Sequence, residues 1–124
     1  MSESNGYATR DSFLSGRQVR RYADVIVDGQ KFRLRSLNAL EANTIQARVI
    51  VEDDEEDRIR EIATANCRTI SQCVVDGNGD RLFSDEDVDQ IAQVDAGFVS
   101  RLAEACSLHA NHRPDAVETA EKNS

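Results

Sequence analysis

Two short runs in which apolar and polar residues alternate flank the pair Asp28-Gly29. The apolar residues of these runs are Val25, Val27, Phe32 and Leu34. Because both turn residues can adopt positive φ, this pattern is the strongest short-range signal for a β-hairpin. A two-stranded hairpin is only marginally stable alone, so its apolar face must pack against other elements.

Helices are predicted for the chain after the hairpin. Asn38 and Glu41 have the spacing of a capping box and begin a helix that we expect to end near residue 51. From Arg58 onward, apolar residues at helical spacing form a stripe of about four turns. Its members are Ile59, Ile62, Ala63, Cys67, Ile70, Cys73 and Val74. We expect this helix to form the centre of the core.

Two further helices follow a turn that contains Gly77 and Gly79. Ser84 and Asp87 form a second capping box in front of a short helix. Asp95 can cap a last helix. The residues expected on its inner face are Phe98, Val99, Leu102, Ala105 and Cys106.

The polar composition of both ends separates a central domain from its flanks. Residues 1–16 are predicted to be a flexible arm that Phe13 and Leu14 hold against the domain. Residues 17–109 form a single domain, and residues 110–124, with the one proline, are predicted to be a disordered tail. The predicted fold class is α+β, with an N-terminal hairpin packed on a small bundle of about four helices.

The charge of the chain argues against several classes of partner. A net charge of −8 repels phosphate backbones and anionic lipids. The short basic cluster Arg17, Arg20 and Arg21 has two interpretations, a DNA contact or a solvated flank. No apolar run approaches the ~18 residues of a spanning helix, and the N-terminus lacks the apolar region of a signal peptide. We therefore expect a cytoplasmic protein that binds neither nucleic acid nor membrane.

The stretch from Asp76 to Asp87 has some features of a calcium loop. Its oxygen-bearing side chains at the first, third, fifth, ninth and twelfth places are Asp76, Asn78, Asp80, Ser84 and Asp87. The sixth place, which needs glycine for a sharp turn, is Arg81, and Asp87 is one methylene shorter than the favoured glutamate. Because a glycine turn and a serine cap explain the same residues, no calcium site is predicted.

A zinc site receives little more support. Cys106, His109 and His112 are spaced three apart, but no fourth ligand is evident. Cys67 and Cys73 lack a partner at CxxC spacing, so all three cysteines are expected to be reduced core residues. We expect one buried thiol and two surface imidazoles at residues 106 to 112, and we predict no cofactor or metal.

An enzymatic function is not predicted, since GxSxG, GxxxxGK[ST] and HExxH are all absent. The acidic run EDDEED, Glu52–Asp57, has two interpretations. Its carboxylates can lie at an exposed junction between two helices, where they interact favourably with the positive end of the following helix. Alternatively, they can form a surface for a cation or a basic partner.

Three segments of the predicted elements are distinctive: the helix opening SLNALEA, the stretch CVVDGNGDRLFSDEDVDQI (residues 73–91) and the last helix FVSRLAEACSLHA. In these segments and in the order of its elements, the chain resembles the tail assembly chaperones of long-tailed bacteriophages. The resemblance covers about Tyr22 to Asn111. It implies a non-enzymatic protein of the host cytoplasm that binds and solubilises the tape-measure protein in several copies and is released as tail-tube subunits polymerise. Such a protein is not expected in the mature virion, and no partner-binding residue is carried over.

The last residues add a prediction that rests on the same resemblance. Members of this family are commonly made in two lengths, the longer by a −1 ribosomal frameshift. Glu121-Lys122-Asn123 can be encoded GAA AAA AAC, which contains the slippery heptamer A AAA AAC. A longer form would link the chain to the tail-tube protein.

The alternative function is an acidic regulatory binding protein, antitoxin-like or a DNA-mimicking inhibitor, that uses Glu52–Asp57.

Overall fold

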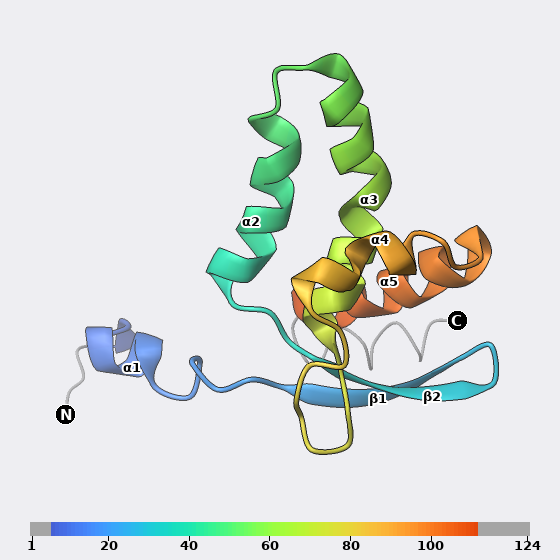
Figure 1. The fold of residues 1–124 in the computed structure, drawn as a ribbon. Coiled ribbons are helices and arrows are strands. Elements are labelled where there is room, and N and C mark those ends of the chain that lie inside the picture. The colour runs from blue at the N-terminus through green and yellow to red at the C-terminus, as the bar shows by residue number, and fades with distance from the viewer. Residues whose placement is uncertain (1–5, 112–124) are drawn as a thin grey trace, which may run out of the picture.

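The computed structural model describes residues 6–111, in which helices cover one face of a three-stranded antiparallel sheet (Figure 1). The elements are α1 (Arg10–Leu14), β1 (Tyr22–Val27), β2 (Gln30–Arg35), α2 (Ala39–Ile50), α3 (Glu55–Cys73), β3 (Val74–Val75), the 3-10 helix η2 (Asp85–Asp87), α4 (Val88–Ile91) and α5 (Ala96–Asn111). This is the α+β class that the sequence predicts, and every helix except the short α1 follows the hairpin. No helix among the described residues is both long and apolar enough to cross a bilayer.

The predicted β-hairpin is confirmed. Strands β1 and β2 pair antiparallel and end at the pair Val27 and Gln30, so that Asp28 and Gly29 form the turn. Their φ angles of 52° and 80° are both positive, as a twisted two-residue hairpin turn requires. The Asp28 carboxylate also accepts two hydrogen bonds from Arg101 of α5, at 2.9 and 2.7 Å. This ion pair lowers the pKa of Asp28 and connects the turn to the last helix.

The third strand was not predicted. Val74 was expected to continue the central helix, but α3 ends at Cys73 and Val74 pairs with Leu34 of β2. The amide of Val74 still donates to the carbonyl of Ile70, while its own backbone is extended. Its β-branched side chain suits this conformation. Pairing with β2 gives hydrogen-bond partners to the backbone groups of Val74 and Val75, which the helix no longer bonds. The strand order β1-β2-β3 leaves β1 at one edge of the sheet.

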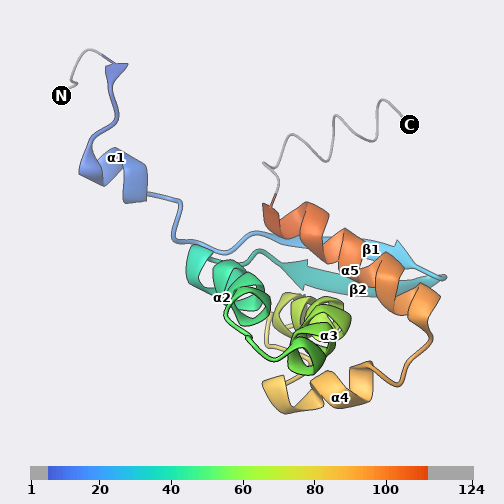
Figure 2. The same cartoon turned by 90° about the horizontal axis from the view of Figure 1, so that it is seen from above.

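The core lies between the inner face of the sheet and the helices α3 and α5. Figure 2 shows α5 running alongside the strands, with α3 seen nearly end-on beside it. The largest fully buried side chains are Leu34, Ile70, Val74, Cys73, Cys106 and Ser71. The predicted inner face of α5 is confirmed, since Val99, Leu102 and Cys106 are buried. All three cysteines are free and buried, as expected.

Helices α2 and α3 form an antiparallel pair that projects from the body (Figure 1). The predicted capping box begins α2: Asn38 accepts from the amide of Glu41 at 2.8 Å, and Glu41 accepts from the amide of Asn38 at 2.9 Å. The prediction that the whole apolar stripe of α3 lies in the core is wrong for its N-terminal half. Ile59 is 60% exposed and Ile62 57% exposed. The sheet and α5 reach only the C-terminal half of this helix.

The N-terminal arm contains the short helix α1, which lies away from the body in both views (Figures 1 and 2). Phe13 is 61% exposed, and no residue of α1 is buried, so the expected packing of Phe13 on the domain is not observed. Its ring instead lies 5.4 Å from the guanidinium of Arg17. Helix α5 continues to Asn111, while the rest of the predicted tail, residues 112–124, lies outside the described residues.

Candidate functional site

The calcium-like stretch forms a hydrogen-bonded turn. The Asp76 carboxylate accepts from the amides of Asn78 and Asp80, at 2.8 and 3.1 Å. Gly79 has a φ of 88°, which glycine adopts without strain. One carboxylate oxygen of Asp76, the residue at the first place of the calcium-like stretch, therefore holds the turn. Among residues 6–111, no group of three or more His, Cys, Asp or Glu side chains is arranged to hold a metal ion.

The second half of this stretch begins η2, as the sequence predicts. The Asp87 carboxylate accepts from the amide of Ser84 at 2.8 Å and from its hydroxyl at 3.3 Å, which confirms the capping box. Arg81, which occupies the place of the calcium-loop glycine, donates to the carbonyl of Ser71 at 3.0 Å and pairs with Asp85 at 2.8 Å. These contacts join the turn to the end of α3.

The candidate zinc residues are used in packing. Cys106 is fully buried beside Cys73. His109 was expected at the surface, but it is only 8% exposed, and its Nε2 lies 2.9 Å from the carbonyl oxygen of Arg21. The guanidinium of Arg21 in turn donates to the carbonyl of His109 at 3.0 Å. The expectation of a surface imidazole at His109 is therefore wrong, because β1 approaches α5 there. His112 lies outside the described residues.

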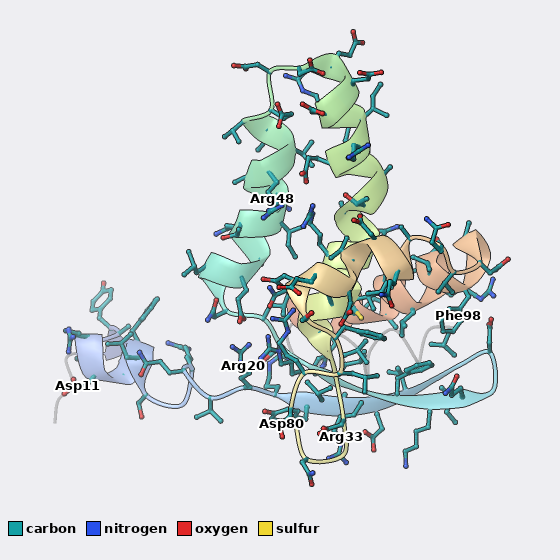
Figure 3. The ribbon with its side chains drawn as sticks, viewed as in Figure 1. Asp11, Arg20, Arg33, Arg48, Asp80 and Phe98 are labelled. Carbon is teal, nitrogen blue, oxygen red and sulfur yellow. The ribbon has the colours of Figure 1, made fainter. Side chains whose placement is uncertain are left out.

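Two residues of the predicted basic cluster, Arg20 and Arg21, are part of the scaffold, while Arg17 is exposed on the N-terminal arm. Arg20 forms two hydrogen bonds with the carboxylate of Glu41, at 2.7 and 2.8 Å, and Arg35 approaches the same carboxylate at 3.4 Å. The hydrogen bond from Arg20, with help from the amide of Asn38, lowers the pKa of Glu41 to about 2. Figure 3 shows Arg20 near the start of α2. Neither a DNA contact nor a solvated flank describes Arg20, because it fixes α2 to the body.

A second ion cluster lies between α2 and α3. Arg48 approaches Glu61 at 3.8 Å, and Arg68 approaches it at 3.3 Å. Figure 3 shows Arg48 on α2, farther from the strands than Arg20. Charged side chains thus occupy much of the contact between the two helices, and α2 has no buried residue. The helical pair therefore lacks an apolar core of its own comparable to that of the body.

The acidic run forms the junction between α2 and α3, as the first interpretation predicts. Asp54 caps α3, and its side chain accepts from the amide of Asp57 at 3.1 Å. Glu55 and Glu56 follow in the first turn, where their negative charges interact favourably with the positive end of the helix dipole. None of the carboxylates of Glu52–Asp57 forms an ion pair with another described residue. Their charge is available to a partner.

The candidate partner-binding surface consists of apolar side chains that the fold leaves exposed. On the projecting pair of helices these are Leu40, Ile50, Val51, Ile59 and Ile62. Next to the C-terminal half of α3 is a groove of about 410 Å³. Its apolar lining is Phe32, Ile70, Phe83, Ile91, Val94, Phe98, Val99 and Leu102. A protein that binds apolar partners needs surfaces of this kind.

Sequence reasoning predicted the helix that carries Ile59 and Ile62 but assigned both residues to the core. One feature of the sequence does indicate that this half of the helix is exposed. Six of the seven residues from Glu55 to Glu61 are charged, and such a density leaves little surface for burial on any side of the helix.

Comparison with known proteins identifies the fold. No protein-family model matches the sequence, and no curated protein matches it. Among solved structures, the chain is similar to the bacteriophage HK97 tail assembly chaperone, with a TM-score of 0.56 and 18% sequence identity. The similarity covers 78% of this chain and 92% of that chain. The protein thus has a fold similar to that of a phage tail assembly chaperone.

Proposed function

We propose that this protein is a tail assembly chaperone of a long-tailed phage or prophage. The observation that carries the proposal is the fold similarity, which spans 92% of the HK97 chaperone. The exposed apolar side chains of α2 and α3 support it, since a chaperone needs apolar surface while unbound. A net charge of −8 favours solubility while that surface is exposed.

The proposed partner is the tape-measure protein, which the chaperone keeps soluble in the host cytoplasm by binding without enzymatic chemistry. Several copies bind along the partner, so that modest affinity per copy gives a strong but reversible complex. A central domain, residues 17–109, carries the binding, with the flanks outside it. Tail-tube subunits displace the chaperone, which is then absent from the mature virion.

Co-expression tests this function. The candidate tape-measure gene is expressed with and without this chain, and the soluble fraction of its product is measured. We expect the tape-measure protein to be soluble only with the chaperone. An unchanged soluble fraction would contradict the proposal.

A longer form of the chain is part of the proposal. Residues 121–123, outside the described part of the structure, can be encoded by a slippery heptamer, and a −1 frameshift there would append a segment that recruits the tail-tube protein. Reading the nucleotides tests this step. A GAG or AAG codon at Glu121 or Lys122 would exclude this slip site.

A second candidate function is an acidic regulatory binding protein. It is favoured by one observation: the acidic run Glu52–Asp57, exposed except for the half-buried Glu52, forms no ion pair with a described cation. Gene neighbours distinguish the two functions. A very long coiled-coil gene directly downstream supports the chaperone, whereas a toxin or nuclease gene supports the regulator.

A further inference from the structure

We infer that the corner between the N-terminal half of α3 and the layer formed by α4 and α5 binds an amphipathic helix whose flanks carry lysine or arginine. This inference rests on the proposed function and specifies the chemistry of the partner. We call this surface the α3 corner and define it by Ile59, Ile62 and Ala63 of α3 together with the groove that Ile70 and Val94 line.

One wall of the α3 corner is the exposed face of α3. The helix has 19 residues, and its N-terminal half stands clear of α4 and α5 (Figure 1). Ile59 lies four residues before Ala63, and Ala63 lies seven residues before Ile70, so that all three share one side of the helix. Glu61, which pairs with Arg48 of α2, lies on the opposite side. Helix α2 therefore leaves this wall uncovered.

The floor of the corner is the groove beside the C-terminal half of α3. Ile70 marks where wall and floor meet, since it belongs to the stripe on α3 and lines the groove with 2% of its surface exposed. Val94 is 45% exposed there, and the rings of Phe32 and Phe98 lie 5.8 Å apart. Figure 3 places Phe98 at the α5 side of this region.

The shape of the corner favours a helix as its occupant. Ile62 and Ala63 lie three and four residues after Ile59, and Ile70 lies seven residues after Ala63. Such spacings place apolar side chains in the ridges that pack into the grooves of a second helix. The corner is formed by the helices α3, α4 and α5, so it has no unpaired strand backbone with which an extended peptide could pair. The wall from Ile59 to Ile70 is about 17 Å long, enough for about three turns of a partner helix.

The charge around the corner selects a basic partner. Glu55 and Glu56 lie on the same side of α3 as Ile59, one turn beyond it, and they form no ion pair with a described residue. Asp87, whose carboxylate also accepts from Ser84, lines the groove beyond Ile70, and Asp89 of α4 is exposed. An apolar stripe with carboxylates at both ends complements an apolar helix face flanked by cations.

Binding to a synthetic peptide tests the inference with the full chain. The probe is a labelled 18-residue helical peptide with leucine at helical spacing and lysine on both flanks, and the readout is fluorescence anisotropy. One control peptide has glutamate in place of lysine, and another has the same composition with scrambled leucines. We expect both controls to bind at least about tenfold more weakly than the probe.

Variants of the chain locate the site. We expect the double variant Ile59→Ser and Ile62→Ser to weaken probe binding at least about tenfold. The double variant Glu55→Lys and Glu56→Lys should weaken it severalfold and reduce its salt dependence. The matched control is Ile26→Ser, because Ile26 is 74% exposed on the outer face of the sheet. This control should bind like the unmodified chain, and circular dichroism checks that every variant is folded.

The outcomes separate this inference from the proposed function. If the Ile59→Ser and Ile62→Ser variant binds the probe as the unmodified chain does, or if the scrambled peptide binds equally well, the inference is wrong. If that variant still solubilises the tape-measure protein, the chaperone function stands and the assigned site fails. If the probe binds as expected but the unmodified chain does not solubilise the tape-measure protein, the site stands and the proposed function fails.

Discussion

The two halves of α3 carry the same kind of residue but meet different surroundings. In the C-terminal half, Ile70 is 2% exposed and packs in the core. In the N-terminal half, Ile59 lies on the same side of the helix and is 60% exposed. Helix periodicity is identical in both halves, so periodicity alone cannot say whether a stripe is a core or a binding surface. The difference is whether other elements reach the stripe.

The largest effect is expected in the buried half. Ile70→Ala should lower the free energy of unfolding by about 2–5 kcal/mol, because it removes buried methyl and methylene groups and leaves a cavity. Denaturant unfolding followed by circular dichroism measures this change. A loss below about 1 kcal/mol would mean that the two halves of α3 do not differ as the structure indicates.

The attachment of the projecting helices depends on Glu41. Glu41→Gln should lower the free energy of unfolding by about 1–2 kcal/mol, since Arg20 and Arg35 lose the charge of their partner. Glu56→Gln is the matched control at the exposed end of the same pair of helices and should change stability by less than about 0.5 kcal/mol. Equal effects of the two changes would contradict the assigned role of Glu41.

The pH dependence of stability gives an independent test of the same contact. The pKa of Glu41 falls from its ordinary value of 4.5 to about 2 in the folded chain. Its contribution is therefore fully present above about pH 4.5 and is lost as the pH falls toward 2. The difference in unfolding free energy between the unmodified chain and Glu41→Gln should shrink over this interval. A difference that is constant from pH 5 to about pH 2 would contradict the pKa shift.

A smaller effect is expected in the turn that resembles a calcium loop. Asp76→Ala should cost about 1 kcal/mol, because two backbone amides lose their acceptor. Asp80→Ala serves as the control, since the Asp80 side chain is exposed and accepts none of these bonds. Thermal unfolding should be the same in millimolar calcium and in a chelator. A rise in Tm with calcium would show that the loop binds the ion.

The smallest effect is expected in the exposed half of α3. Ile59→Ala should change the free energy of unfolding by less than about 0.5 kcal/mol, because little surface is buried there and alanine favours the helix. The same denaturant experiment as for Ile70→Ala measures it. A loss comparable to that of Ile70→Ala would show that Ile59 is covered in solution, for example by a second copy.

Signals that depend on neighbouring residues were read correctly from the sequence. Asp28-Gly29 predicted the hairpin turn, and the capping boxes at Asn38 and Ser84 predicted where helices begin. The acidic run was also predicted correctly as the junction between two helices, although α3 begins within the run, at Glu55 after the cap Asp54. Each of these features is held by hydrogen bonds within four residues, so a short window of sequence contains all of its determinants.

Features that depend on distant segments were missed. Val74 joins β2 across 40 residues of chain, and His109 is buried because the backbone of Arg21 lies against it. The exposure of Ile59 likewise reflects how far the sheet and α5 extend along α3. No local pattern around these residues records the position of the element that covers them or fails to cover them.

By itself, then, the amino-acid sequence determined where the chain turns, where its helices begin and which faces of them are apolar. The tertiary structure decided which of those faces are buried. The physical reason is that conformational preference and capping act through neighbouring atoms, whereas burial depends on which parts of the chain, far apart in sequence, exclude water from the same surface.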